Sequence, residues 1–359
     1  MLNKFIINNI SINNLYVIFF YAIYLYLNFS FALLFFSLLI FVIPLITLGK
    51  EIDKSHGIEV KNKSRLGGLI IIITLLIFYF NNILVLKNLL FESINFFFIV
   101  FFAISLLGLV DDLFGKLGHL IRLYFNIFAI FILLYTNNVF LFRDTEIDFI
   151  NYIFQYKYLS YFITIFIIVG FINASNISDG ANGILSGISS VAFLVFYLET
   201  GDLIYLKLFE VILFFFIFNI FIGKVYLGDA GSYLLGFLIS TISLYLYNIN
   251  IFPAGLLACM LCYPSIEVLM TIIRRLSKLQ NPFLPDNFHL HNLIHDKYNK
   301  SKFKNYNTNS LTGITILSLF SFPSLALYLF LPDNLLFLFW VLFFAQTAVY
   351  IFVYRYLKY

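Results

Sequence analysis

The chain has 359 residues, of which 62% are apolar and only 11% charged, with a net charge of +4. Soluble domains carry about a quarter charged residues, so the composition excludes an ordinary soluble protein. Apolar runs long enough for a bilayer core recur along the whole chain. Because these runs lack strand-like alternation, we predict an all-α, polytopic membrane protein.

The predicted spans follow one another without a linker. The N-terminal segment 1–29 contains the short apolar stretch 15–27, which is either an extra span or an interfacial helix. Residues 30–359 form one predicted transmembrane domain with about 11 helices. In chain order the spans are 30–48, 66–81, 93–110, 120–141, 157–173, 183–199, 203–222, 232–249, 252–273, 311–331 and 335–357.

Lysine and arginine are divided unevenly between the two membrane faces. We define side A as the face with the loops 49–65, 111–119, 174–182, 223–231 and 274–310. Counting Arg122, just inside the next span, side A carries fifteen Lys and Arg residues and the opposite face carries four, so the positive-inside rule makes side A cytoplasmic. All of the histidines also lie in side-A loops: His56, His119, His289, His291 and His295. We therefore expect a cytoplasmic active site assembled from several loops, with chance clustering as the alternative.

Two adjacent aspartates, Asp111 and Asp112, follow the apolar run 93–110 at the side-A boundary. Neighbouring carboxylates repel each other, which raises one pKa unless a cation is near. A Mg²⁺ ion, which prefers oxygen ligands and phosphate, would be such a cation. The alternative is a solvated loop that closes a helix.

The stretch 171–187 spaces four polar residues three positions apart: Asn173, Asn176, Asp179 and Asn182. In a helix this spacing forms one polar stripe. Such a stripe is costly in lipid and is expected to face a cavity. The alternative is a helix–helix interface made of small and polar residues.

Further polar stretches lie in the loops at 223–231 and 274–310. Asp229 precedes a predicted span and suits either a metal or a helix cap. Arg274 and Arg275 suit a diphosphate through charge-assisted bonds, with membrane anchoring as the alternative. For His289 and His291 we favour contact with substrate phosphate over zinc, because no other ligand cluster accompanies them.

Five of these stretches, in this order, resemble the motifs of the polyprenyl-phosphate N-acetylhexosamine-1-phosphate transferases, glycosyltransferase family 4. The likeness runs from about residue 30 to the C-terminus and is nearest to the bacterial undecaprenyl-phosphate N-acetylglucosamine-1-phosphate transferase group. The matching motifs are the His/Lys…Arg-Gly-Gly loop in 56–68, Asp111-Asp112, Asn-x-x-Asn-x-x-Asp-Gly from Asn173, Gly-Asp-x-Gly-Ser from Gly228, and Arg274-Arg275 followed by Pro-Phe-x-Pro-Asp-x-x-His-x-His.

The resemblance implies that a polyprenyl phosphate attacks the β-phosphorus of a UDP-N-acetylhexosamine and that UMP leaves. It implies Mg²⁺ as cofactor, with Mn²⁺ as an alternative, and the bacterial inner membrane as the location. The product would start a surface glycan such as the O-antigen of lipopolysaccharide, a capsule or a teichoic acid. The expected partners are the two substrates and the membrane, with no nucleic acid, and a homodimer is left open.

The resemblance also implies roles for single residues. Asp229 would bind the metal with Asn176 as a second contact. Asp111 would deprotonate or orient the lipid phosphate, with Asp112 near the metal. Asp179 completes the catalytic acids and, with Asn182, lines the nucleotide-sugar pocket. The other residues expected to bind substrate are Asn173, Arg122, Arg274, Arg275, His289 and His291.

Two departures from the family pattern concern the sugar. Many bacterial members carry Asp where this chain has Asn182, and His291 is followed by Asn292 instead of a second histidine. A run of three histidines is absent from this loop, which disfavours the alternative of a phospho-MurNAc-pentapeptide-type transferase of peptidoglycan synthesis. A secondary transporter is the alternative of another class. It would place its polar residues at mid-membrane, whereas here they lie at the side-A ends of the spans.

Overall fold

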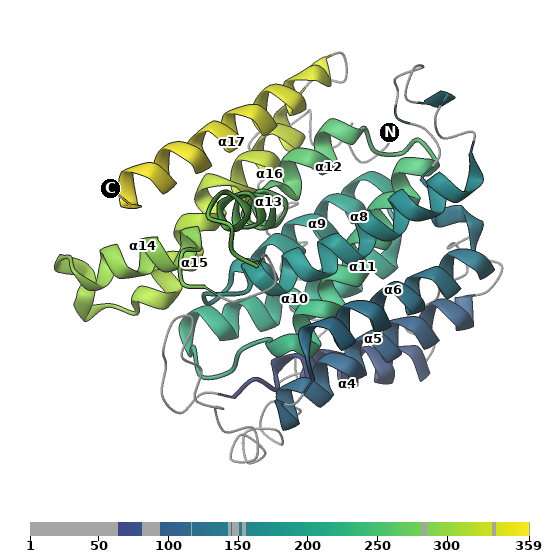
Figure 1. The fold of residues 1–359 in the computed structure, drawn as a ribbon, viewed down its shortest axis with the longest axis horizontal. Helices are drawn as coiled ribbons and strands as arrows, with labels where there is room; N and C mark the ends of the chain where they lie inside the picture. Colours follow the sequence, from purple (N-terminus) through teal and green to yellow (C-terminus); the bar gives the residue numbers. More distant parts are fainter. Residues whose placement is uncertain are drawn as a thin grey trace, which may run out of the picture.

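A computed structural model describes residues 64–80, 94–115, 117–142, 145, 151–152, 156–281, 286–331 and 335–358. Within these ranges the chain folds into helices (Figure 1), and no strand is formed apart from an isolated parallel bridge between Ser64 and Val225. The predicted all-α fold is confirmed. The predicted segment 1–29 and the span 30–48 lie outside the described residues.

The helices follow the predicted order. They are α4 (Gly67–Phe80), α5 (Ile94–Phe114), α6 (His119–Thr136), the short η3 (Asn138–Phe140), α8 (Lys157–Ser178), α9 (Ile184–Thr200), α10 (Leu203–Phe221), α11 (Gly228–Asn248), α12 (Ala254–Met260), α13 (Cys262–Ser277), α14 (Leu290–Asn299), the short η4 (Lys302–Asn305), α15 (Thr308–Leu319), α16 (Ser321–Phe330) and α17 (Phe337–Lys358).

Ten of the predicted spans coincide with these helices or helix pairs. Among the described residues, seven segments are long and apolar enough to cross a membrane, or eight if the bent pair α12–α13 is one span. The apolar helices α4 and α9 are shorter. The chain is therefore a multi-pass membrane protein, while the total of about 11 spans stays a prediction.

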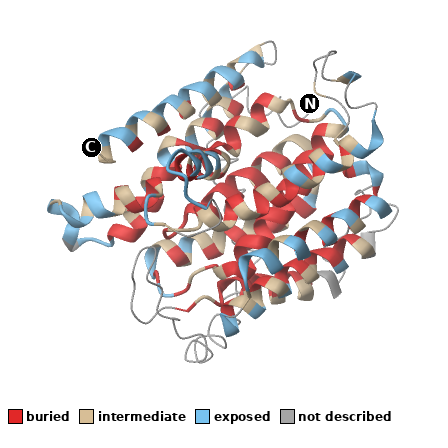
Figure 2. Cartoon of the chain, in the orientation of Figure 1, coloured by how far each residue is buried: buried red, intermediate tan, exposed pale blue. Residues whose placement is uncertain are grey.

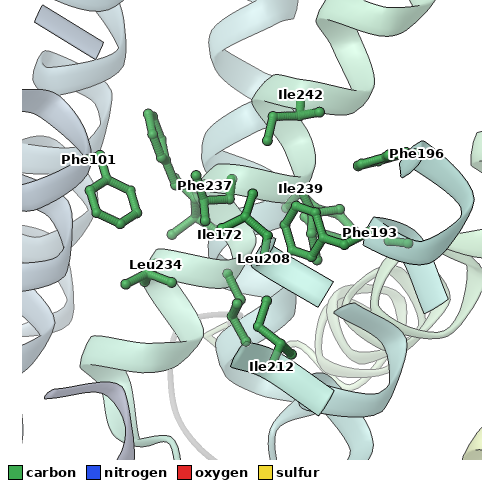
Figure 3. Close-up of a cluster of buried hydrophobic side chains, with 14 of the residues drawn as sticks. Phe101, Ile172, Phe193, Phe196, Leu208, Ile212, Leu234, Phe237, Ile239 and Ile242 are labelled. Atoms are coloured by element: carbon green, nitrogen blue, oxygen red, sulfur yellow. The ribbon is translucent and has the colours of Figure 1, made fainter. Parts of the chain in front are cut away.

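Helix α11 forms the centre of the molecule. All of its residues from Asp229 to Tyr247 are buried, and it packs against α4, α5, α8 and α9. Figure 2 shows this buried centre inside an exposed periphery. Around it Phe237 lies near Phe101 of α5 and Ile172 of α8 (Figure 3). Helix α11 is therefore packed along its whole length, and this packing fixes the position of its side-A end.

Two predicted spans are broken by proline. The span 252–273 bends by 72° between α12 and α13, where Pro264 lies in the first turn of α13. A proline ring clashes with the carbonyl group four residues earlier, which interrupts the helix there. Pro323 has the same place in α16, directly after the break at Phe320.

At the side-A ends, three helices are longer than predicted. Helix α5 continues to Phe114, α8 to Ser178, and α11 already begins at Gly228. Asp111, Asp112 and Asp229 therefore lie in helix termini, where the prediction had placed them in loops.

Candidate active site

Arg122 joins two acidic motifs at the side-A ends of α5, α6 and α11. Its Nη1 atom lies 2.7 Å from Asp111 Oδ2 and 2.5 Å from Asp229 Oδ2. Asp111 also accepts a hydrogen bond from the Leu117 backbone, at 3.1 Å. One positively charged nitrogen thus lies between two carboxylates that are 118 positions apart in the sequence.

The other oxygen of Asp229 faces the polar stripe of α8. Asn176 Nδ2 donates to Asp229 Oδ1 and to Ser232 Oγ, both at 3.0 Å. Asn173 lies on the same helix but donates to the Val169 carbonyl. The stripe is therefore helical through Asn176, and Asn176 is the member that reaches Asp229.

Asp112 binds the start of α11. Its two oxygens accept hydrogen bonds from the backbone N–H groups of Asp229 and Ala230, at 2.9 and 2.8 Å. A carboxylate at a helix N-terminus compensates its unpaired N–H groups and its dipole. Asp112 thereby positions the backbone that carries Asp229.

Backbone contacts bring a fourth motif to the same place. Gly67 and Gly68 donate their N–H groups to the carbonyls of Tyr226 and Leu227, both at 2.8 Å. A Cβ atom on Gly68 would lie 2.2 Å from the backbone nitrogen of Gly231. The Arg-Gly-Gly loop therefore packs directly on the loop that precedes α11.

Asp179 follows the last turn of α8 as its C-terminal cap. Burial raises the pKa of this carboxyl well above its ordinary value, and the charges of Asp229 and Asp112 raise it further, against a lowering by Arg65. We call Asp111, Asp112, Arg122, Asn176 and Asp229 the acidic cluster. Asp179 is influenced by the charges of Asp229 and Asp112 in this cluster.

Asn182 is fixed by α15. Its backbone N–H donates to Asn309 Oδ1 at 2.6 Å, and its side chain donates to Ser310 Oγ at 3.0 Å. The side chain is buried. These contacts make Asn182 a connection between two segments, and its place in a sugar pocket stays a prediction.

The two histidines lie together on one face of α13. The rings of His289 and His291 stack at 5.3 Å between centroids. A Cβ atom on Gly180 would lie 1.9 Å from His291 Nε2, so this ring packs on the residue after Asp179. Burial, and then the neighbouring His289, lower the pKa of His291 to about 3, against the opposite influence of Glu267.

Arg274 and Arg275 both bind Asp286. Arg274 Nη2 contacts both of its oxygens, at 2.8 and 2.9 Å, and Arg275 Nε contacts one at 2.9 Å. Although burial alone would raise the pKa of Asp286, these guanidinium groups and the Phe288 N–H hold it below its ordinary value. The two arginines thus anchor the loop before the histidines, and their binding of substrate stays a prediction.

The histidines and the paired arginines form a second cluster with partners that the sequence analysis did not predict. These partners are Tyr263, Glu267, Asp286 and Tyr350. Glu267 had a detectable signal, because it is a lone acid inside the apolar run 252–273, where ionisable groups are rare and functional. Asp286 is the acid of the Pro-Phe-x-Pro-Asp motif. Nothing in the local sequence marked the two tyrosines.

The acidic cluster suits a hard divalent cation. Asp229, Asn176 and Asp111 offer oxygen donors, which Mg²⁺ prefers, and the Arg122 nitrogen already occupies a position between two carboxylates. The described residues contain no group of three or more His, Cys, Asp or Glu arranged to hold a metal. Mg²⁺ tolerates this, because it usually takes one or two protein carboxylates together with water and phosphate.

Comparison with known proteins gives the family. The family model of glycosyl transferase family 4 matches residues 94–247. The chain is 34% identical over 249 residues to the undecaprenyl-phosphate alpha-N-acetylglucosaminyl 1-phosphate transferase of Thermotoga maritima, over 69% of this chain and 72% of that protein. The chain belongs to glycosyl transferase family 4.

Two further relatives align over shorter ranges. The probable undecaprenyl-phosphate N-acetylglucosaminyl 1-phosphate transferase of Bacillus subtilis is 30% identical, over 54% of this chain and 56% of that protein. The corresponding Escherichia coli K12 enzyme is 34% identical, over 37% of this chain and 40% of that protein. The family-4 match at 94–247 includes the acidic cluster, whereas the histidine loop lies beyond it.

Proposed function

We propose that this family-4 enzyme transfers an N-acetylhexosamine 1-phosphate from a UDP-sugar to a polyprenyl phosphate and releases UMP. The observation that carries the proposal is the meeting of Asp111, Arg122 and Asp229 at the side-A ends of membrane helices. A lipid acceptor and a water-soluble donor must meet at such a boundary. The relatives, named as undecaprenyl-phosphate N-acetylglucosaminyl 1-phosphate transferases, support the same acceptor and sugar class.

In this reaction an oxygen of the lipid phosphate forms a bond to the β-phosphorus of the UDP-sugar. The bond from that phosphorus to the bridging oxygen breaks, and the bridging oxygen leaves with UMP. Asp111, at the end of α5, would accept the proton of the acceptor phosphate or orient it. Arg122 would compensate the phosphate charge, which is the main demand of phosphoryl transfer on a protein.

Asp229 and Asn176 would hold Mg²⁺, with Mn²⁺ as the alternative, and the ion would neutralise the diphosphate. Asp112 fixes the backbone of Asp229, and Asn176 fixes its carboxylate. Preorganised charges of this kind lower the barrier because they need not reorient during the reaction. His291, which packs on Gly180, would contact the donor substrate together with His289 and the paired arginines.

UMP release by the purified protein in detergent tests this proposal. The assay contains undecaprenyl phosphate, Mg²⁺ and a panel of UDP-N-acetylhexosamines that includes UDP-MurNAc-pentapeptide. We expect UMP from one sugar, loss of UMP with EDTA, and loss of at least about a hundredfold in Asp229→Asn, as for other preorganised charges. Glu210→Gln, whose acid pairs with Lys207 on α10, is the control with unchanged activity. No UMP from any donor with folded protein would contradict the proposal.

The same proposal includes the setting of the enzyme. We place it in a bacterial inner membrane with side A in the cytoplasm, where UDP-sugars are found. Its product would start a lipid-linked surface glycan such as an O-antigen. The excess of Lys and Arg on side A supports this orientation.

A further inference from the structure

Glu267 is a completely buried acid in α13, with 0% exposure. Helix α13 runs past α17 and α8 in the C-terminal part of the molecule (Figure 1). A buried carboxylate is costly unless charged or polar partners satisfy it. The partners of Glu267 therefore indicate why it is there.

Both oxygens of Glu267 accept hydrogen bonds. Oε1 lies 3.0 Å from His289 Nδ1. Oε2 accepts from the Leu290 backbone at 3.1 Å and from the Tyr350 hydroxyl of α17 at 3.0 Å. A carboxylate only accepts, so Nδ1 of His289 must carry a proton.

The second histidine is held in the same manner. Tyr263, one helical turn before Glu267, bonds His291 Nδ1 at 2.9 Å. The two rings are parallel within 7°, and Nε2 of His291 faces Gly180. Because both Nδ1 atoms face α13, both Nε2 atoms point away from it: that of His291 lies at Gly180, next to Asp179, and that of His289 lies 3.9 Å from Asp286 Oδ1, on the side of the paired arginines.

We propose that Glu267 is a positioning residue: it fixes His289 with the proton on Nδ1 and directs Nε2 toward the diphosphate of the donor substrate. This inference rests on the proposed function. A ring with a proton on each nitrogen donates from Nδ1 to Glu267 and from Nε2 to a phosphate oxygen at the same time. Tyr350 holds Glu267 from α17, so the C-terminal helix takes part in positioning.

The other groups around His289 are compatible with this role. Asp286 Oδ1 lies 3.9 Å from His289 Nε2, and Asp286 is itself bound by Arg274 and Arg275. Thr271 lies 3.4 Å from Nδ1. His289 retains 12% side-chain exposure, which leaves its ring accessible to a ligand.

The variant Glu267→Gln reverses the proton position by a simple hydrogen-bond argument. The Leu290 N–H can only donate, so the amide oxygen must take the place of Oε2. The amide NH₂ then takes the place of Oε1 and donates to His289 Nδ1. The proton of the neutral ring must move to Nε2.

Nitrogen NMR of ¹⁵N-histidine-labelled protein in detergent measures which ring nitrogen of His289 carries the proton. The variant His289→Asn assigns the signal. We expect a protonated Nδ1 in the wild type and in Tyr350→Phe, and an unprotonated Nδ1 in Glu267→Gln. An unprotonated Nδ1 in the wild type overturns the proposal, even if Glu267→Gln does not fold. An Nδ1 of His289 that is still protonated in folded Glu267→Gln also overturns the proposal.

Kinetics separate positioning from a structural role. In Glu267→Gln we expect the KM for the UDP-sugar to rise about tenfold, the size of one hydrogen bond to a charged group. The KM for polyprenyl phosphate is expected to stay within about twofold, because that substrate meets the acidic cluster. Equal loss for both substrates would contradict the proposal. Absence of UMP release in the wild type would instead contradict the proposed function. The NMR result would then still decide whether Glu267 fixes the proton of His289 on Nδ1.

Discussion

At the scale of single residues, Asp111 and Asp112 are neighbours with different contacts. Asp111 meets a side chain, Arg122, at 2.7 Å. Asp112 meets only fixed backbone donors, the N–H groups of Asp229 and Ala230. An amide in place of Asp112 would direct its NH₂ group against one of these N–H groups, whereas Asp111 borders a side chain that can adjust.

We therefore expect Asp112→Asn to lower the free energy of unfolding by about 1–3 kcal/mol, the cost of leaving a buried donor unpaired. Asp111→Asn is the matched variant and is expected to lose less stability while still losing UMP release. Thermal unfolding in detergent measures both. A larger drop in midpoint for Asp111→Asn than for Asp112→Asn would contradict this interpretation.

His291 makes stability depend on pH. Burial and the neighbouring His289 lower its pKa to about 3, whereas a free histidine titrates near 6.5. Between these values the unfolded chain binds a proton that the folded chain does not, so stability falls as the pH falls. The expected slope is about 1.4 kcal/mol per pH unit below pH 6.5.

Unfolding midpoints in detergent between pH 7.5 and pH 5 measure this dependence. His291→Asn is expected to flatten the slope, and His119→Asn, at the exposed start of α6, is expected to keep it. A slope that is the same in the wild type and in folded His291→Asn would show that other groups cause it.

At the scale of helices, α5 and α11 cross in close contact at a glycine. A Cβ atom on Gly108 would lie 2.5 Å from the carbonyl oxygen of Asp229. Backbone atoms cannot yield as a flexible side chain does, so the helices would have to separate. The approach that a small residue permits is a general device of membrane helix packing.

Gly108→Ala is accordingly expected to destabilise the protein by about 1–3 kcal/mol, as overpacking does, and to lower UMP release because Asp229 shifts. Gly170→Ala in α8 is the control, since no atom lies within 4 Å of its added Cβ. There alanine is expected to stabilise the helix by about 0.5–1 kcal/mol. Equal midpoints for the two variants would contradict the close crossing.

The helices themselves were predictable, but their ends were not. Long apolar runs identified ten helices or helix pairs within the described residues, because only helices or barrels satisfy the backbone in lipid. The hydropathy pattern predicted that α5 ends before Asp111 and that α11 begins after Asp229, because charged residues usually lie in loops outside membrane spans. Asp112 and Asp229 are held at the helix ends by contacts with residues distant in sequence, Asp112 with the Asp229 backbone and Asp229 with Arg122, which hydropathy does not register.

The candidate site shows the same limit. Family-like spacing grouped Asp111, Asp112, Asn176 and Asp229, and these residues lie together at one end of the bundle, joined through Arg122 and Asp229. It did not separate the backbone contacts of Asp112 from the side-chain pair of Asp111. Tyr350 could not be found at all, because its contact with Glu267 joins residues 83 positions apart.

At the scale of the whole molecule, the polar contacts gather at the side-A ends of the helices. Asp111 ends α5, Arg122 begins α6, and Asp229 begins α11. Helix α13 also ends on its arginines, Arg274 and Arg275. An antiparallel bundle places these ends on one membrane face, so a single labelling experiment tests the orientation of the whole site.

We expect Lys278→Cys, after α13, to react with a membrane-impermeant maleimide only in inverted vesicles. Tyr158→Cys, at the opposite end of α8 and 90% exposed, is the matched position and is expected to react in intact spheroplasts. Both native cysteines, Cys259 and Cys262, are buried, so they give little background. Labelling of Lys278→Cys from the outer face would place the acidic cluster outside, where UDP-sugars are absent, and would contradict both the orientation and the proposed donor.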